Sequence, residues 1–569
     1  MLPRNPCISH RLILRGRPFR IDPSKSISHA PLSIITATRI GEPRMASPSS
    51  KSGLSASPPT FSVKGAHNSL LLEMTGLGQQ PASGRLLRGL TPYLDEQGAA
   101  HVFLLTERKR REPWAEDPKT VVAYQELVHW ERGKAGGIYR GVCAKGNSLK
   151  RNDILQAFEY EPLDLIEWAA RRLEAAVVSS HTPLSLDIQY VEKPWGREGW
   201  YTGIEARGVS RVRSASGTTE LPYALGMFPV PLIGEREDPL ILLKTLEPLP
   251  EPVYGDLYLE VHREKWETYV VLDVDPEAWP EGQGCLRAGL DAEKAREFEK
   301  EFGRDWPDKM AEGLKAAILG YETIRREIDG LLDQALEERG EDTTRPVAPE
   351  LHMTLLSALP ENLRDREAQA RSEVESFLGR TTLRPGDVAV LPPGVLHSLQ
   401  HGVRVIEFQT PTYERLIAMF AQKVLTQPHW DVDEAVALME KAPYIPPQPQ
   451  VLEESGEGRV ERIVDFPQFQ VDRVQLPLNS ALAGRTEGQN RYLLLFVTKG
   501  KGELLLPDGE THFLEPDMAY LVPACLGDYR VEAISAQGLT FLRAVPALSP
   551  FGEQEDTSMT VDEVLERTW

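Results

Sequence analysis

Cysteine is scarce in this sequence of 569 residues, with only Cys7, Cys143, Cys285 and Cys525. No two of them form a CxxC pair, so the sequence contains neither a zinc ribbon nor the framework of a disulfide-rich secreted domain. A reducing compartment is therefore expected, and the predicted location is cytoplasmic.

Long apolar runs and an excess of basic residues are also missing. No stretch approaches the roughly 20 apolar residues that a membrane-spanning helix needs. Asp and Glu number 84 against 64 Lys and Arg, which gives a formal net charge of -20. No membrane and no nucleic acid is therefore expected as a partner, since a phosphate backbone requires a basic surface. Any phosphate that this protein binds must meet a local cluster of cations.

Acids are rare in the N-terminal segment, where only Asp22 and Glu42 occur before residue 60. This segment, rich in Arg, Ser and Pro, resembles an organelle transit peptide. A disordered tail over 1–64, or translation that starts near Met45, is the alternative interpretation. No catalytic residue is expected there on either interpretation.

The rest of the chain alternates between helical and β-rich patterns. Apolar spacings of three and four predict amphipathic helices over Asp117–Trp130 and Asp153–Val177. From Pro183 onward, short β-rich runs separated by Gly and Pro predict a sandwich or barrel. The charged segment from Asp291 to Glu338 has helical spacing and predicts helices inserted into this β domain. A further helix is predicted over Thr412–Leu425.

Three side chains of metal-ligand type occur close together in GDLYLEVHREKWETYVVL, which begins at Gly255. Glu260 and His262 are separated by one residue on a predicted strand, so both project from the same face. Glu267 follows five residues after His262, on the returning arm of a predicted turn. Two acids and one imidazole are therefore expected to converge on one point.

A fourth candidate ligand occurs in GDVAVLPPGVLH, where a predicted strand ends in the turn Pro392-Pro393-Gly394 and His397 follows. A single strand histidine is commonly structural. Two imidazoles and two carboxylates at these joint spacings, however, form a donor set suited to Zn, Mn, Fe or Ni. The sequence therefore predicts one divalent-metal site.

Together the two segments resemble the paired motifs of the cupin superfamily, G-x5-H-x-H-x3-4-E and G-x5-P-x-G-x2-H. The second motif is matched at every position by Gly386, Pro392, Gly394 and His397. In the first motif, an acid stands where many cupins have histidine. The long helical insertion between the motifs is similar to that of type I mannose-6-phosphate isomerases, which also end in a further, metal-free barrel.

Three other stretches resemble the same family, and the resemblance extends over about 186–546. They are EKPWGREGWYTG (Glu192–Gly203), LILLKTLEP (Leu240–Pro248) and VRVIEFQTPTYERL (Val403–Leu416).

The resemblance implies a set of site residues. The family's metal set of Gln-x-His, Glu and His falls on Glu260, His262, Glu267 and His397, and it implies one divalent ion, with zinc as the expected metal. Lys265 and Arg415 fall on catalytic residues of the family. The implied substrate-binding residues are Lys244, Lys265 and Arg415.

This chain departs from the family in two ways. Glu260 replaces the usual Gln, which adds a negative charge beside the metal. The segment between His262 and Glu267 is compressed to four residues, as in simple cupins, which reshapes the rim of the pocket.

The fold class that follows is mainly β with α. It consists of two cupin (jelly-roll) β-barrels, the first carrying a helical insertion, plus an N-terminal α/β extension. The predicted parts are a disordered tail (1–64), an N-terminal α/β region without an assigned role (65–180), a metal-binding cupin barrel (181–275 and 381–443), a helical insertion (276–380), a linker (444–459), a metal-free cupin barrel (460–550) and a C-terminal tail or helix (551–569).

The function implied by the resemblance is a metal-dependent aldose–ketose isomerase that converts mannose 6-phosphate to fructose 6-phosphate through a cis-enediol. The expected partner is thus a small-molecule sugar phosphate, and the oligomeric state stays open. The proton-transfer base also stays open, between a metal-bound water and a pocket acid such as Glu267. A non-catalytic sugar-binding cupin, an Fe(II) cupin oxygenase and a purely structural double barrel are the alternatives.

Overall fold

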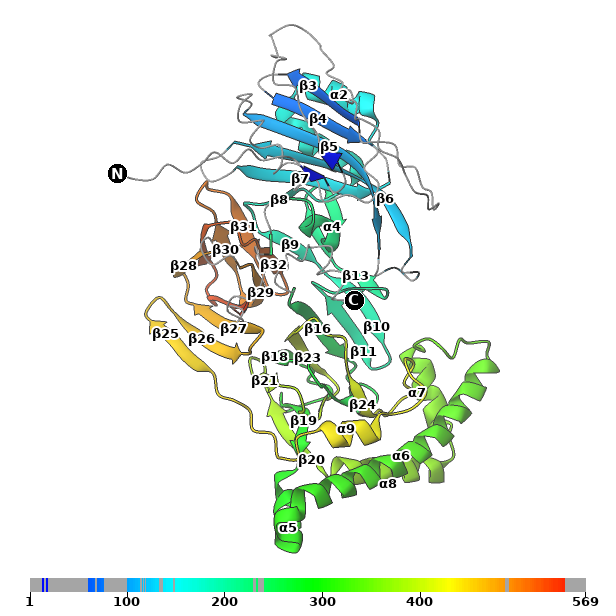
Figure 1. The fold of residues 1–569 in the computed structure, drawn as a ribbon. Coiled ribbons are helices and arrows are strands. Elements are labelled where there is room, and N and C mark those ends of the chain that lie inside the picture. The colour runs from blue at the N-terminus through cyan, green and yellow to red at the C-terminus, as the bar shows by residue number, and fades with distance from the viewer. Residues whose placement is uncertain are drawn as a thin grey trace, which may run out of the picture. The chain divides into compact units, whose positions relative to one another are not determined.

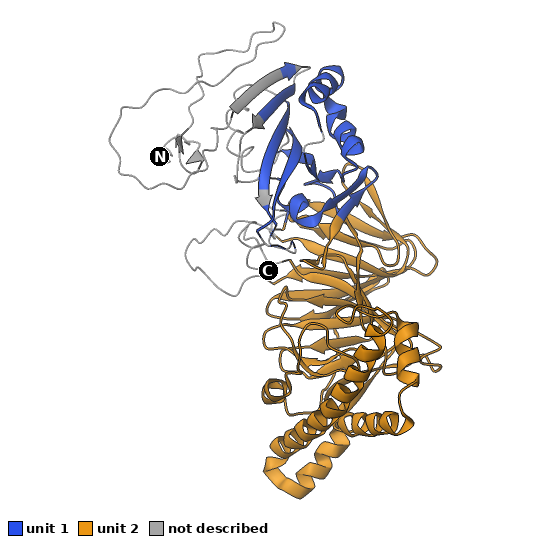
Figure 2. Ribbon diagram, turned by 90° about the vertical axis from the view of Figure 1, so that its right-hand side faces the viewer, with its two compact units in different colours: residues 1–184, 212–232 blue, residues 185–211, 233–569 orange. Residues whose placement is uncertain are grey.

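The chain forms two compact units, residues 1–184 with 212–232 and residues 185–211 with 233–569 (Figure 2). It is mainly β with several helices, which confirms the expected fold class. The predicted limits of the individual domains stay predictions. The C-terminal tail or helix and most of the N-terminal tail lie outside the described residues. The computed structural model describes residues 13–14, 17–18, 60–66, 69–75, 100–112, 115, 117, 119–132, 137–146, 149–228, 232–233, 240–486 and 491–547.

The first unit contains a mixed sheet with the order β3-β4-β5-β6-β7-β8, in which β4 and β5 are parallel. Two helices pack on it, since Phe158 of one and Ile166 of the other share a core with Phe103 and Leu127. The strands are β1 (Ile13–Leu14), β2 (Arg17–Pro18), β3 (Thr60–Ala66), β4 (Ser69–Thr75), β5 (His101–Arg111), β6 (Val121–Glu131), β7 (Ile138–Lys145), β8 (Val178–Ser179), β14 (Arg211–Ser214) and β15 (Gly217–Glu220). The helices are α2 (Arg151–Tyr160), η1 (Pro162–Asp164), α3 (Leu165–Leu173) and α4 (Leu221–Leu225).

One predicted helix of this unit is wrong and the other is confirmed. Asp117–Trp130 is largely strand β6, whose residues 124–130 are all buried. A strand that is buried on both faces loses its alternation of apolar and polar residues, so its pattern imitates a helix. The helices α2 and α3 occupy the stretch predicted as Asp153–Val177, with a break at Pro162.

The second unit begins with a lobe of two sheets, which we call the first lobe (residues 189–211 and 233–443). A six-stranded sheet has the order β10-β11-β16-β23-β18-β21, and a five-stranded sheet has the order β20-β19-β22-β17-β24. A single core lies between them, with Tyr269 and Val405 from one sheet and Val261 and Ile417 from the other. The strands are β10 (Gln189–Lys193), β11 (Gly196–Trp200), β12 (Ile204–Glu205), β13 (Gly208–Val209), β16 (Leu242–Pro248), β17 (Leu259–Val261), β18 (Glu267–Val274), β19 (Gly284–Leu290), β20 (Leu378–Leu383), β21 (Val388–Leu391), β22 (His397–Leu399), β23 (Val403–Gln409) and β24 (Leu416–Met419), and helix α9 (Val432–Leu438) follows.

Two predictions for this lobe need correction. The described strands form two open sheets rather than a closed barrel, because β10 and β21 end one sheet and β20 and β24 end the other. The segment predicted as a helix over Thr412–Leu425 contains strand β24 instead. Its apolar run pairs with β17, so a tertiary contact overrides the local pattern.

The inserted helices run between β19 and β20, in agreement with the prediction of helices from Asp291 onward (Figure 1). The longest, α6, buries a stripe that includes Met310, Leu314, Ile318 and Tyr321. Two further helices, α7 and α8, lie in the polar stretch within the predicted helical insertion of 276–380. None of the helices in the described part of the chain is long and apolar enough to cross a membrane. The helices are α5 (Ala292–Phe302), η2 (Gly303–Asp305), α6 (Trp306–Glu337), α7 (Pro349–Ser357) and α8 (Glu361–Glu375).

A histidine at the contact of α7 with the segment before β17 makes stability depend on pH. The Nδ1 atom of His352 lies 3.3 Å from the hydroxyl of Tyr254. Burial, with a contribution from the charge of Arg325, lowers the pKa of His352 from 6.5 to about 4. The folded state therefore binds fewer protons than the unfolded state between these values, so stability falls as the pH falls through this window.

Replacement His352→Gln is expected to remove this dependence. The unfolding free energy of the wild type should fall relative to the variant by on the order of 1–3 kcal/mol between pH 7.5 and pH 4.5. Urea titrations at the two pH values measure the difference. His429→Gln, at an exposed position, is the control, and superimposable pH profiles of wild type and His352→Gln would contradict the prediction.

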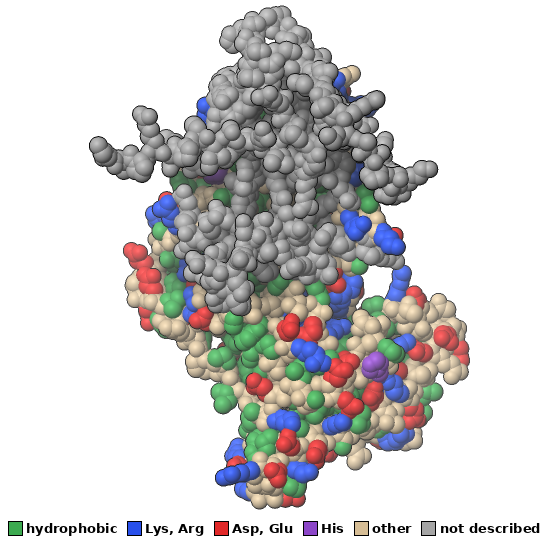
Figure 3. Space-filling view, viewed as in Figure 1, with side chains coloured by type: hydrophobic (Ala, Val, Ile, Leu, Met, Phe, Trp, Pro, Cys, Tyr) green, Lys and Arg blue, Asp and Glu red, His purple; other side chains and the backbone are tan. Residues whose placement is uncertain are grey.

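A second pair of sheets forms the C-terminal lobe (residues 450–547). Its core combines Val474, Leu495 and Phe541 from one sheet with Leu504 and Val531 from the other. Strands from residue 460 onward agree with the predicted second β region. Acidic and basic side chains are interspersed over the described part of the face in Figure 3. The strands are β9 (Leu184–Asp187), which joins the larger sheet, β25 (Gln450–Ser455), β26 (Gly458–Asp465), β27 (Phe469–Leu476), β28 (Ala481–Arg485), β29 (Leu493–Gly500), β30 (Gly502–Leu505), β31 (Thr511–Leu514), β32 (Ala519–Val522), β33 (Asp528–Ala533) and β34 (Leu539–Pro546).

Candidate metal centre

Backbone pairing brings the two sequence motifs together. Strand β17 pairs with β22, and Glu260 lies opposite His397 in this register. His262 follows β17 directly, and Glu267 is the first residue of β18. Residues that are far apart in the chain therefore meet at one end of the first lobe.

The turn that precedes His397 also holds His262. In Pro392-Pro393-Gly394-Val395, the amide of Val395 donates to the carbonyl of Pro392, and Gly394 has a φ of 89°. A positive φ at the third position of such a turn favours glycine. The amide of Gly394 also donates to the backbone carbonyl of His262 at 2.9 Å. The turn thus ties the second motif to the first.

The four predicted ligands converge. The Nε2 atoms of His262 and His397 lie 3.3 Å and 3.2 Å from the same Oε2 atom of Glu267. The Nε2 atom of His262 lies 3.7 Å from Oε1 of Glu260. Glu260, His262 and His397 each offer one donor atom, and these three atoms lie within 4.8 Å of one another. Both imidazoles and Glu267 are buried, and Glu260 is partly exposed.

Hydrogen bonds leave the donor atoms aimed at a common centre. The Nδ1 atom of His262 lies 2.8 Å from the carbonyl oxygen of Glu414, and Nδ1 of His397 lies 2.9 Å from that of Val395. Each Nδ1–H donates to its carbonyl, so each Nε2 can present a lone pair. Three buried atoms of the cluster have no hydrogen-bond partner: Nε2 of His262, Oε2 of Glu260 and Oε2 of Glu267. A divalent cation would satisfy these atoms, so the donor set fits the expected metal.

The charges in the cluster keep both acids ionised. Burial alone would raise the pKa of Glu267, but Lys265 and His262 lower it well below its ordinary value. The pKa of Glu260 is also lowered, because Lys265, His262 and Arg415 outweigh the effect of burial. Ionised carboxylates are the form that binds a metal. The low pKa of Glu267 favours a role as ligand over a role as proton-transfer base.

A chain of alternating charges continues from the cluster along the six-stranded sheet. Lys265 forms an ion pair with Glu267. Lys244 lies opposite Glu407 in the pairing of β16 with β23, and its Nζ atom lies 3.1 Å from Oε2 of Glu407. Glu198 lies 3.8 Å from the same Nζ. Burial and the nearby charge of Glu267 raise the pKa of Glu407 to about 8, against the opposing effect of Lys244.

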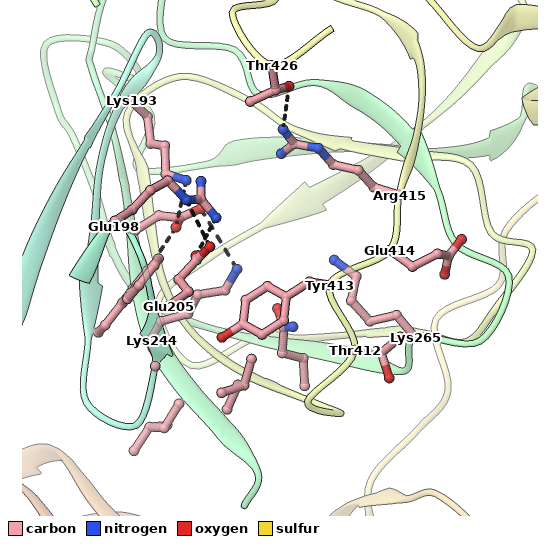
Figure 4. Close-up of a pocket in the computed structure, with 16 residues that line it drawn as sticks. Lys193, Glu198, Glu205, Lys244, Lys265, Thr412, Tyr413, Glu414, Arg415 and Thr426 are labelled. Carbon is pink, nitrogen blue, oxygen red and sulfur yellow. Dashed lines mark hydrogen bonds and ion pairs between the residues drawn. The ribbon is translucent and has the colours of Figure 1, made fainter. Parts of the chain in front are cut away.

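A cavity of about 320 Å³ lies beside the cluster and contains the three predicted substrate-binding residues (Figure 4). The guanidinium of Arg415 stacks on the ring of Tyr258 at 4.6 Å and donates to Oγ1 of Thr426 at 3.2 Å. The cavity can therefore bring cationic groups against an anionic or hydroxylated ligand. Its cationic lining residues are Lys193, Arg207, Lys244, Lys265 and Arg415.

Three acidic or basic residues of this region were missed in the sequence. Glu198 and Lys193 form a buried ion pair at 3.0 Å beside Lys244. Glu407 shares a strand face with the core residues Val403 and Val405, so its position breaks the apolar alternation of β23. An acid on the apolar face of a predicted strand is a signal that could have identified Glu407.

The solved structures that this chain resembles include mannose 6-phosphate isomerases. No protein-family model matches the chain, and no curated protein gives a significant match. The mannose 6-phosphate isomerase from Bacillus subtilis aligns at 15% sequence identity over 64% of this chain and 99% of its own, with a TM-score of 0.41.

Two further structures align over 64% of this chain and 100% of their own. One is a zinc-bound mannose 6-phosphate isomerase, at 15% identity and a TM-score of 0.42. The other is an arginine-to-alanine mutant of phosphomannose isomerase from Salmonella typhimurium, at 16% identity and a TM-score of 0.42.

Proposed function

We propose that this protein is a metal-dependent aldose–ketose isomerase that interconverts mannose 6-phosphate and fructose 6-phosphate. The observation that carries the proposal is the convergence of two imidazoles and two carboxylates beside a cavity whose lining includes five cationic and three acidic side chains. Lys265 belongs to both features, since it pairs with Glu267 and lines the cavity. The sequence motifs of the family supply the choice of reaction.

The proposed metal ligands are Glu260, His262, Glu267 and His397, and zinc is the expected ion. When bound, such an ion supplies Lewis-acid polarisation of the carbonyl and hydroxyl oxygens of a sugar. The low pKa values of Glu260 and Glu267 support this assignment, because both side chains are anionic at neutral pH.

The proposed catalytic residues are Arg415 and Lys265. As a proton moves between C2 and C1, negative charge develops on the oxygens of the cis-enediol. The guanidinium of Arg415 opposes this charge from a fixed position on Tyr258. Lys265 and Lys244 are placed to donate hydrogen bonds to phosphate or sugar oxygens. Burial would lower the pKa of Lys244, but Glu198 and Glu407 outweigh it and raise that pKa, so Lys244 is positively charged at neutral pH.

An anaerobic assay with mannose 6-phosphate tests the proposal. Purified protein is expected to hold about one divalent ion per chain and to form fructose 6-phosphate without O2. Treatment with EDTA should abolish turnover, and stoichiometric Zn²⁺ should restore it, because the ligand set requires a cation. Mannose and glucose 6-phosphate serve as comparison substrates.

Other outcomes of the same assay support the alternatives. Binding of mannose 6-phosphate without isomerisation would indicate a sugar-binding protein. Turnover that requires Fe(II) and O2 would indicate an oxygenase. Protein that retains no ion after metal reconstitution would contradict every metal-dependent function.

A further inference from the structure

One residue, Glu414, contacts the metal centre through both its main chain and its side chain. Its carbonyl oxygen accepts the hydrogen bond from Nδ1 of His262 at 2.8 Å. Its carboxylate accepts the backbone amide of Arg263 at 2.7 Å and 3.0 Å, and that of Glu264 at 3.3 Å. Glu414 thus binds the metal-ligand histidine and both residues that follow it.

These contacts restrain two different parts of the site. A carboxylate that accepts backbone amides forms charge-assisted hydrogen bonds, which are stronger than neutral ones. The amides belong to the short connection between β17 and β18, which carries His262, Lys265 and Glu267. A carbonyl that accepts the second nitrogen of a metal-bound histidine orients its ring. Glu414 therefore restrains the connection and the imidazole together.

The next residue along the chain is Arg415. Segment 412–415 has no regular secondary structure, so the ladder of a sheet does not hold it. Figure 4 shows the side chains of Glu414 and Arg415 leaving this segment in different directions. The carboxylate of Glu414 reaches the metal-binding connection, and both residues line the cavity. The contacts of Glu414 therefore restrain the position of the backbone at Arg415.

We propose that Glu414 is a positioning residue that couples the orientation of His262 to the placement of Arg415. Its carboxylate accepts backbone amides and is not one of the four proposed metal ligands. Its catalytic consequence rests on the proposed function, whereas its effect on the metal centre does not. A matched control exists in Glu264, an exposed acid of the same connection.

The test compares Glu414→Ala and Glu414→Gln with Glu264→Ala in the full-length protein. Glu414→Ala keeps the carbonyl that accepts from His262 but removes the carboxylate that holds the connection, so it is expected to weaken Zn²⁺ binding about tenfold, the lower end of the usual effect of changing a residue that supports a metal ligand. Competition with a chelating dye measures this affinity. The amides of Arg263 and Glu264 should exchange with solvent faster in hydrogen-exchange measurements. In the isomerase assay, kcat should fall while KM changes little.

Glu414→Gln retains one acceptor oxygen and should give intermediate values, while Glu264→Ala should stay within about threefold of the wild type in Zn²⁺ affinity. Unchanged Zn²⁺ affinity and unchanged amide exchange in Glu414→Ala would overturn the proposal. An equal loss of Zn²⁺ affinity in Glu264→Ala would also overturn it. The loss would then follow from the removal of one negative charge and not from the contacts of Glu414. If the wild type shows no isomerase activity, the proposed function fails, and Zn²⁺ affinity and amide exchange still decide the role of Glu414.

Discussion

Replacement of His397 by alanine is expected to remove the bound divalent ion and to lower kcat by at least about a thousandfold. The Nε2 atom of His397 lies 3.2 Å from Oε2 of Glu267 in the buried cluster, where it is one of the two imidazole donors. Lewis-acid stabilisation contributes several kcal/mol to a transition state, and each 1.36 kcal/mol corresponds to about tenfold in rate. Metal analysis and the isomerase assay, performed on one preparation, measure both effects.

A second histidine variant separates loss of the ion from general damage. His429→Ala, at an exposed position outside the cluster, should retain the ion and full activity. Circular dichroism should show the same secondary structure in both variants. Full metal content in His397→Ala would contradict the assigned ligand set, because this residue is one of only two imidazoles in it.

Replacement of Arg415 by alanine is expected to lower kcat about 100- to 1,000-fold while the ion is retained. Removal of one positive group that opposes a developing oxyanion has an effect of this size. The side chain contacts Tyr258 and Thr426 and none of the four proposed ligands directly. Steady-state kinetics and metal analysis of the same protein test the two halves of this expectation.

Arg415→Lys tests whether activity requires the planar guanidinium as well as the positive charge. A lysine keeps the positive charge but cannot reproduce the planar stacking on Tyr258, so most of the activity loss should persist. Arg263→Ala is the control, since Arg263 is an exposed arginine that pairs with Glu434. A wild-type kcat in Arg415→Ala would exclude this residue from the chemistry, whatever the metal content.

The local parts of the site could be predicted because they depend on short segments. Strand alternation places Glu260 and His262 on one face, and the turn at Gly394 depends on a glycine with a positive φ. Helices over residues 151–173 and from residue 292 also follow from local spacing. Two helices were predicted where strands occur, at β6 and β24, because burial and pairing outweigh apolar spacing in both segments.

The sequence by itself determined the candidate ligands, since a two-residue period and a glycine-dependent turn are properties of the chain over a few residues. Only the tertiary structure decided which charges face one another. Lys244 meets Glu407 through the register of β16 with β23, and Glu414 reaches Arg263 across a gap of more than a hundred residues in the chain. Such pairs depend on sheet register and on the packing of irregular segments, which no local pattern encodes.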